Sequence, residues 1–156
     1  MLTKTPPTRD PIDALLAAPD GAVLAVIAGV EGPSYRPVGA MMAVFSESER
    51  AGTLSSGCIE SDIALHAMAA AENGAPRLLR YGRGAPFVDI QLPCGGGLDI
   101  LLLPNPDRAL QTKVAQNRRD RAPCSLAIET DTGAMTLEAT GATGRVGTRL
   151  TVRFDP

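Results

Sequence analysis

The chain has 156 residues, the length of a single domain, and its 44% hydrophobic and 21% charged content is that of an ordinary globular protein, which argues against disorder. The formal net charge of −2 provides no basic field that would attract nucleic acid or an anionic membrane surface. Aromatic residues make up 3% of the chain, and no apolar run approaches the roughly 20 residues of a membrane-spanning helix, so neither a base-stacking surface nor a membrane span is expected.

Cysteine usage and the N-terminal sequence favour a reducing compartment. The 3 cysteines are an odd number at low density, which is not the pattern of a disulfide-stabilised secreted domain. The opening stretch, MLTKTPPTRDP, lacks the apolar centre of a secretion signal. We therefore expect a cytoplasmic protein, in which a glycine-flanked cysteine is a functional thiol rather than half of a structural disulfide.

The first two thirds of the chain predict alternating helices and strands after a flexible arm over residues 1–10. Asp10 and Pro11 are helix start signals, which predict a short helix over 11–18. The apolar run over 22–30 predicts a strand that is buried on both faces. The further elements predicted in this part are strands at 41–45, 51–57, 77–82 and 98–104 and helices at 58–74 and 107–120.

The last third changes to the alternating pattern of antiparallel strands. Two runs within 124–138 are joined by Asp131-Thr132-Gly133, a hairpin signal. The stretch 145–154 predicts one half-buried strand, with Val146, Thr148, Leu150, Val152 and Phe154 on its inner face. The glycines of GATGRVG (141–147) loosely resemble a dinucleotide-binding loop, but a strand follows them instead of a helix, so we interpret this stretch as a turn.

These patterns together predict an α+β fold in a single domain over 11–156. We expect a mixed β-sheet, two main helices and a C-terminal antiparallel hairpin unit over 123–156, and no Rossmann domain in this chain. Because the sequence ends directly after a strand, we expect this end to lie where a further domain could begin.

Cys58 and Cys94 are the first candidates for chemistry, because each lies beside glycine, where no side chain shields the sulfur. Cys58 follows Gly57 at the start of a predicted helix, where the unpaired N–H groups favour a thiolate, although Glu60 opposes this if it lies close. Cys94 precedes Gly95-Gly96-Gly97, a run that lets a ligand approach the backbone and can form an anion-binding nest. The alternative is structural: a small buried Cys58 with Glu60 complementing the first helical turn, and a tight turn at Cys94.

The other candidates favour binding over a metal centre. A structural zinc site needs four ligands at characteristic spacings, and the chain offers no C-x-x-C pair and one histidine, His66, in the middle of a predicted helix. Cys124 shares its strand face with apolar residues and is expected in the core. Ser34, Tyr35 and Arg36 lie in a loop between two apolar strands, where Arg36 suits a phosphate; the alternative is an exposed arginine without that role.

Three segments taken in order resemble the XdhC/CoxI family of accessory proteins for molybdenum hydroxylases. They are VEGPSYRPVGAMM, GTLSSGCIESDIA and LPCGGGLDILLLP, within residues 23–104. Family members carry a Gly-Ser-Ser-Tyr-Arg-like segment, a Ser-Gly-Gly-Cys-Val-Glu segment and a Cys-Gly-Gly segment before a strand. This chain departs from that pattern at Ser56, where the family usually has glycine, and it lacks the Rossmann domain into which longer members continue.

The resemblance implies a maturation factor rather than an enzyme. Such a chaperone holds the molybdenum cofactor as cargo, either molybdopterin or its cytosine dinucleotide form, supports its sulfuration, and hands it to a xanthine dehydrogenase-like molybdenum hydroxylase. Cys58 and Cys94 would be the contacts to molybdenum, which favours sulfur partners. The cofactor-binding residues that the resemblance implies are Ser34, Arg36, Gly57, Cys58, Glu60, Cys94, Gly95 and Gly96.

A cysteine desulfurase and a separate Rossmann-type domain are the further partners that the resemblance suggests. A homodimer is also expected, since two-fold dimers are the commonest oligomers of soluble proteins. Two other readings of the residues stay open. One is a thiol-based redox or sulfur-carrier protein that uses Cys58 and Cys94, and the other is a plain protein-interaction domain whose cysteines are buried. In the favoured reading both sulfurs face one cavity from neighbouring loops.

Overall fold

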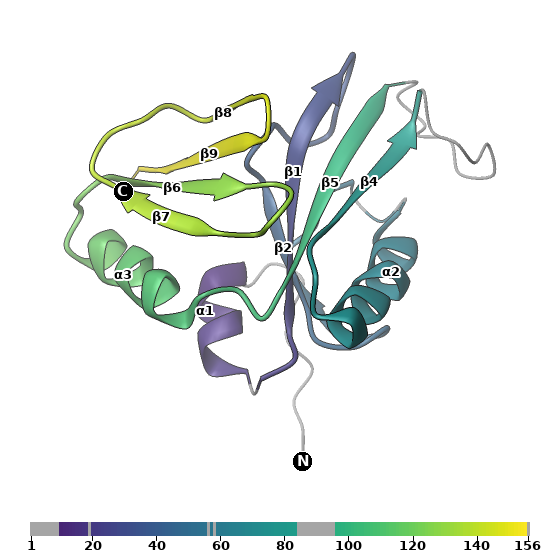
Figure 1. Cartoon of the computed structure of the whole chain (residues 1–156), viewed down its shortest axis with the longest axis horizontal. Coiled ribbons are helices and arrows are strands. Elements are labelled where there is room, and N and C mark those ends of the chain that lie inside the picture. The colour runs from purple at the N-terminus through teal and green to yellow at the C-terminus, as the bar shows by residue number, and fades with distance from the viewer. Residues whose placement is uncertain (1–9, 19, 56, 58, 84–95, 156) are drawn as a thin grey trace.

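A five-stranded sheet with its longest strand in the middle forms the centre of the fold (Figure 1). The structure is a computed structural model, and it describes residues 10–18, 20–55, 57, 59–83 and 96–155. The strand order in this sheet is β3-β2-β1-β5-β4. Its strands are β1 (Val23–Glu31), β2 (Met41–Val44), β3 (Arg50–Ala51), β4 (Arg77–Gly82) and β5 (Gly97–Pro104).

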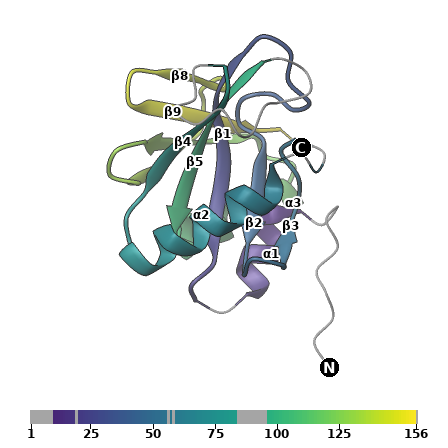
Figure 2. The ribbon, with the colours of Figure 1, turned by 90° about the vertical axis from the view of Figure 1, so that its right-hand side faces the viewer.

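A second sheet and the helices cover the two faces of the first. The second sheet has the order β7-β6-β9-β8, and α2 lies on the face of the first sheet that points away from it (Figures 1 and 2). The strands of the second sheet are β6 (Cys124–Glu129), β7 (Met135–Glu138), β8 (Gly144–Val146) and β9 (Arg149–Phe154). The helices are α1 (Pro11–Ala17), α2 (Glu60–Asn73) and α3 (Arg108–Arg119).

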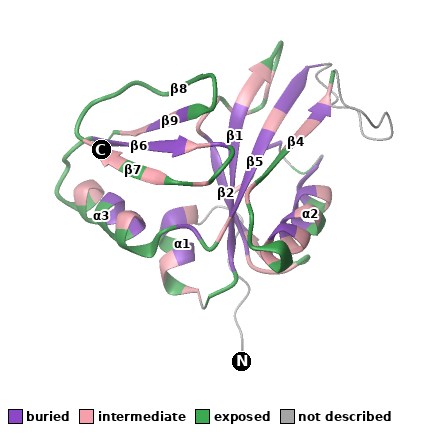
Figure 3. Cartoon of the chain, viewed as in Figure 1, coloured by how far each residue is buried: buried purple, intermediate pink, exposed green. Residues whose placement is uncertain are grey.

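The strand β1 is buried on both faces from Val23 to Ala28, as its apolar run predicts, and it separates two apolar cores (Figure 3). Alternate residues of a strand point to opposite faces. Val23, Ala25 and Ile27 therefore join the core beneath α2. Leu24, Val26 and Ala28 join the other core, which includes residues of α1, α3 and the second sheet. Cys124 lies in this second core at 2% exposure, which confirms its predicted place.

The α+β class, the two main helices and the C-terminal hairpin are confirmed, with four corrections in detail. The expected mixed sheet contains only antiparallel pairs among the described strands. The strand predicted over 51–57 is reduced to the pair Arg50–Ala51, because the backbone N–H groups that follow bind a side chain instead of a neighbouring strand. The helix predicted from residue 58 begins at Glu60.

The strand predicted over 145–154 is wrong at its beginning. Gly147 has φ +60, a conformation that glycine adopts without strain, and it turns the chain between β8 and β9. Val146 is consequently 84% exposed, whereas Leu150 and Val152 are buried as predicted. Within GATGRVG, Gly144–Val146 forms β8 and Gly147 turns the chain into β9, so the interpretation of the whole stretch as a turn is wrong for 144–146, and a strand follows it as expected. In the described part of the chain, no helix has the length and apolar character needed to span a membrane.

Candidate functional site

Three connecting segments meet at the end of the central sheet where β1 ends and β5 begins. Glu31 pairs with Gly97, and Gly97 pairs with Gly82 on its other side. The loop after β1 and the connection between β4 and β5 therefore leave the sheet at the same end of the strands (Figure 1). The segment between β3 and α2, which contains Cys58, joins them there through a side-chain contact. Cys58, Cys94 and Gly95 themselves lie outside the described residues, so the shared cavity expected for the two sulfurs stays a prediction.

The loop between β1 and β2 is the element that contacts the other two segments. Arg36 Nη1 donates a hydrogen bond to the Thr53 carbonyl at 2.9 Å, and the Ser34 hydroxyl donates to the Arg36 carbonyl at 2.6 Å. Gly96, two residues after Cys94, lies so close to this loop that a Cβ at that position would clash with the Pro33 carbonyl oxygen. The close approach explains why glycine is needed there. The loop thus joins two predicted binding residues to described parts of both cysteine-bearing segments.

The buried carboxylate of Glu60 holds the segment that contains Cys58. Glu60 is the first residue of α2 and is 2% exposed. The donors on Oε2 are the Thr53 hydroxyl and the N–H groups of Leu54 and Ser55, both at 2.8 Å. The donors on Oε1 are the Ser55 hydroxyl (2.5 Å) and the N–H groups of Gly57 (3.0 Å) and Ile59 (3.3 Å). We call Glu60 and these five residues the Glu60 cluster.

The hydrogen bonds of the cluster keep Glu60 ionised in spite of its burial. Burial alone raises the pKa of a carboxyl group, because the charged form loses its hydration. Here the bonds from the hydroxyls of Ser55 and Thr53, and from the N–H groups of Ser55 and Leu54, outweigh burial and lower the pKa from 4.5 to about 2. The cluster therefore contains a fixed negative charge at every physiological pH.

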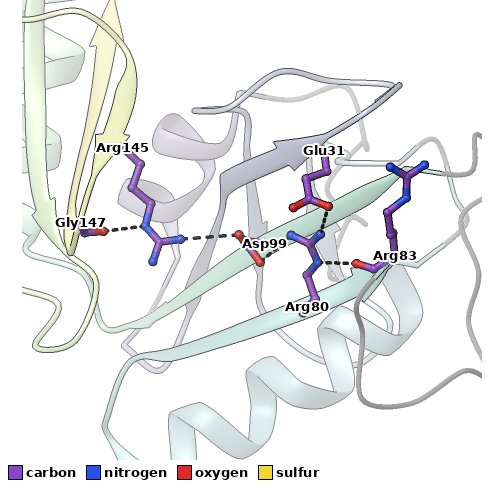
Figure 4. Close-up of polar contacts among 6 residues, drawn as sticks. All are labelled: Glu31, Arg80, Arg83, Asp99, Arg145 and Gly147. Carbon is purple, nitrogen blue, oxygen red and sulfur yellow. Dashed lines mark hydrogen bonds and ion pairs between the residues drawn. The ribbon is translucent and has the colours of Figure 1, made fainter.

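A chain of ion pairs lies beside the base of the connection that contains Cys94 (Figure 4). Arg80 on β4 contacts Glu31 at 2.8 Å and Asp99 at 3.2 Å. Asp99 also lies 3.6 Å from Arg145 of β8, and Arg145 donates to the Gly147 carbonyl at 3.0 Å. The pairs therefore link β1, β4 and β5 to the hairpin of the second sheet.

Arg80 also holds both described ends of the connection between β4 and β5. Its Nε donates to the Arg83 carbonyl at 2.8 Å, and the Arg83 N–H donates to the Gly96 carbonyl at 3.1 Å. A Cβ at Gly97 would lie 2.5 Å from Arg80 Nη2, so the guanidinium occupies the space that a larger residue would fill. No sequence signal indicates this role for Arg80, because it depends on the pairing of Arg80 with Asp99 across two strands.

His66 lies on α2 beside Asp62, with 3.5 Å between His66 Nε2 and Asp62 Oδ2. The same carboxylate accepts a hydrogen bond of 2.5 Å from the Tyr81 hydroxyl. Burial and the Asp62 carboxylate raise the pKa of Tyr81 well above its usual range. No group of three or more His, Cys, Asp and Glu side chains that could hold a metal ion occurs among the residues that the structure describes.

Two hollows lie at the opposite end of the central sheet, around the stretch from Asn105 to Asp107. Their volumes are about 370 Å³ and 440 Å³. Gln111 borders the smaller one, and its Oε1 is a buried acceptor without a donor among the described residues. None of the candidate residues from the sequence lines either hollow.

The chain forms an antiparallel α+β domain. Described parts of two cysteine-bearing segments lie with an arginine-bearing loop at one end of its central sheet. Residues 15–82 match the model of the XdhC and CoxI family. This match covers the first two of the three sequence segments, and it confirms the resemblance to the family over this part of the chain.

Two curated relatives match over a similar length. The chain is 39% identical over 94 residues to the protein named molybdenum cofactor insertion chaperone PaoD of Escherichia coli (strain K12), covering 60% of this chain and 29% of that protein. It is 33% identical over 102 residues to a probable xanthine dehydrogenase subunit of Bacillus subtilis (strain 168), covering 65% of this chain and 31% of that protein. The chain thus spans less than a third of each of these two relatives.

A solved structure shares the fold over almost the whole chain. A crystal structure of a protein described as a xanthine dehydrogenase, from Bacillus halodurans, superposes with a TM-score of 0.73 and 22% identity. The match covers 95% of this chain and 53% of that one. At this identity the likeness establishes the fold alone, and function has to be inferred from the residues of the site.

Proposed function

We propose that this chain is the cofactor-binding part of a molybdenum cofactor insertion chaperone. It holds the cofactor as cargo, supports its sulfuration, and delivers it to a xanthine dehydrogenase-like molybdenum hydroxylase, as an accessory factor without turnover of its own. The observation that supports this most is the contact of one loop with both cysteine-bearing segments, through Arg36 to Thr53 and through Pro33 to Gly96. The family match and the name of the Escherichia coli relative support the same class of function.

The proposed roles follow from the chemistry of each group. The sulfurs of Cys58 and Cys94 are soft ligands, which suit molybdenum and its sulfur-rich surroundings. Gly57 and Gly95 leave room for a large cofactor beside the backbone, and Gly96 allows the loop after β1 to pack against the segment that contains Cys94. Ser34 and Arg36 face the cofactor phosphate; an arginine has five N–H donors, and the bond to Thr53 uses one of them.

The finer features of this function are part of the proposal. The cargo is molybdopterin or its cytosine dinucleotide form. A cysteine desulfurase supplies the sulfur, and a separate Rossmann-type domain is a further binding partner. The chaperone is a homodimer. Each is tested by co-purification of the tagged chain from cells that make the cofactor, followed by analysis of the bound pterin, the bound proteins and the mass of the complex.

The decisive experiment replaces both glycine-flanked cysteines by serine and measures cofactor retention. After co-expression with cofactor biosynthesis, the Cys58→Ser/Cys94→Ser variant should retain no molybdenum or pterin and should fail to activate a co-expressed molybdenum hydroxylase, with its melting temperature unchanged. Cys124→Ser is the matched control. It buries an unpaired hydroxyl in the core, which destabilises the fold by about 1–3 kcal/mol but leaves retention intact.

The opposite pair of results would refute the assignment. A large drop in melting temperature with normal activation in the double variant would mean that Cys58 and Cys94 are structural. Mass spectrometry of the purified wild-type chain separates the alternatives, because a persulfide or a disulfide at these residues indicates a sulfur carrier or a redox protein, and two unmodified, unreactive thiols indicate an interaction domain.

A further inference from the structure

The Glu60 cluster includes both chain neighbours of Cys58. Gly57 and Ile59 are the neighbours of Cys58 on either side, and the N–H groups of both donate to the same oxygen, Oε1 of Glu60. The Ser55 hydroxyl donates to that oxygen and accepts from the Ile59 N–H at 3.0 Å. The backbone is therefore fixed on both sides of the cysteine by one carboxylate.

We propose that Glu60 is a positioning residue: its carboxylate fixes the five other residues of the Glu60 cluster, and through the two of them that adjoin Cys58 it places this cysteine for the cofactor. This inference rests on the proposed function of Cys58. In this proposal Glu60 does not contact the cofactor, as the resemblance implied, but acts on it indirectly.

The contacts of Glu60 leave it little capacity for a ligand. A carboxylate has about four lone-pair sites, and each oxygen of Glu60 already accepts from three donors within the cluster. The side chain is also 2% exposed. A cofactor would have to displace hydrogen bonds to a buried charge, which are among the strongest in proteins.

The cluster requires a negative charge, because every partner of Glu60 among the described residues is a donor. Glutamine has nearly the same shape, but one of its two terminal atoms is an NH₂ group. Either orientation of that amide would turn N–H bonds toward three donors, so Glu60→Gln should disrupt the cluster almost as much as removal of the side chain.

The effect of losing Glu60 should be local. Its described partners lie within residues 53–59. Leu54 and Ile59 share an apolar core with Ile63, Ala64 and Ala67 of α2, and this apolar packing does not depend on the carboxylate. Loss of the carboxylate should therefore release the segment while α2 stays packed on the sheet.

Chemical rescue of Glu60→Ala tests the proposal without the cofactor. Acetate has the same heavy atoms that this substitution removes, and acetamide is its neutral counterpart of nearly equal size. Hydrogen–deuterium exchange of the peptide containing 53–59 should become at least about tenfold faster in the variant, because the segment loses its hydrogen bonds to a charged group. Acetate should restore the slow exchange, and acetamide should not. Glu72→Ala, an exposed position on the same helix, is the matched control and should exchange like the wild type.

Two results would overturn the proposal: unchanged exchange of 53–59 in Glu60→Ala, or equal rescue by acetamide, which would mean that volume and not charge fixes the segment. If Glu60→Ala does not fold, Glu60→Gln takes its place, and its 53–59 peptide should exchange faster while peptides from α3 and β6 stay unchanged. Faster exchange throughout the molecule would also overturn it.

Retention of the cofactor is the second measurement, and it separates this proposal from the proposed function. If the wild-type chain retains pterin, Glu60→Ala should retain at least about tenfold less than Glu72→Ala, and acetate should restore retention. Equal retention in the two variants would refute the positioning role. If the wild-type chain retains none, the proposed function has failed, and the exchange experiment still decides what Glu60 does.

Discussion

Acidification should abolish the stabilising effect of Glu60 in a pH range that its lowered pKa defines. The pKa of Glu60 is about 2 in the folded chain and 4.5 for an ordinary glutamate. A carboxyl group with a lowered pKa stabilises the fold fully above its unfolded pKa, and the stabilisation disappears as the pH falls toward its folded pKa. The window is therefore pH 4.5 to about 2. A shift of this size corresponds to about 3 kcal/mol of unfolding free energy.

Urea unfolding of the wild type and of Glu60→Gln at a series of pH values between 7 and 2 measures this effect. The variant cannot titrate at residue 60, and the other carboxyl groups titrate in both proteins, so the difference between their free energies of unfolding isolates Glu60. We expect that difference to be constant above pH 4.5 and to shrink by about 3 kcal/mol toward pH 2. Glu72→Gln, on the exposed face of α2, should follow the wild type throughout.

A difference that stays constant from pH 7 to pH 2 would refute the reasoning, because it would mean that Glu60 has the same pKa in the folded and unfolded chain. The donors around the carboxylate would then fail to favour its ionised form over its protonated form.

Two further predictions concern the contacts that join the segments. Gly96→Ala should lower both the melting temperature and cofactor retention, because its Cβ would clash with the Pro33 carbonyl oxygen, whereas Gly144→Ala, with open space around it, should do neither. Arg80→Lys should leave the core intact but speed hydrogen exchange of the Arg83 N–H, because lysine lacks the planar fork that reaches three acceptors at once. Unchanged exchange at Arg83 would show that the ion pairs do not fix the base of the connection.

The sequence was sufficient for the elements whose hydrophobic pattern matches their burial. The run over 22–30 is apolar at every position except its glycine, and it forms the central strand. Asp10, Asp107 and Gly74 lie at helix ends, where the two aspartates accept the first N–H groups and Gly74 adopts φ +67. Such local signals act within a few residues, so they can be read without knowledge of the fold.

The sequence was insufficient where a glycine or a side chain decides between two backbone paths. Residues 145–154 alternate like one strand, and only the positive φ of Gly147 divides them. Residues 53–55 are compatible with a strand, but their N–H groups bind Glu60 from the next helix. Arg80 and Asp99 become partners through the register of β4 and β5, which periodicity alone does not specify.

The two cysteine-bearing segments are held by side chains of opposite charge, and both of these bind backbone groups. Glu60 accepts from N–H groups on each side of Cys58, and Arg80 donates to the carbonyl of Arg83 at the start of the connection that contains Cys94. These bonds between a charged side chain and the backbone are lost when the side chain is replaced, whereas Leu54 and Ile59 of the first segment also lie in the apolar core beneath α2. Replacement of either charged side chain should therefore loosen the backbone of its loop while the two apolar cores stay packed. For this reason local exchange and cofactor retention, rather than the melting temperature alone, are the measurements that distinguish a binding site from a structural turn.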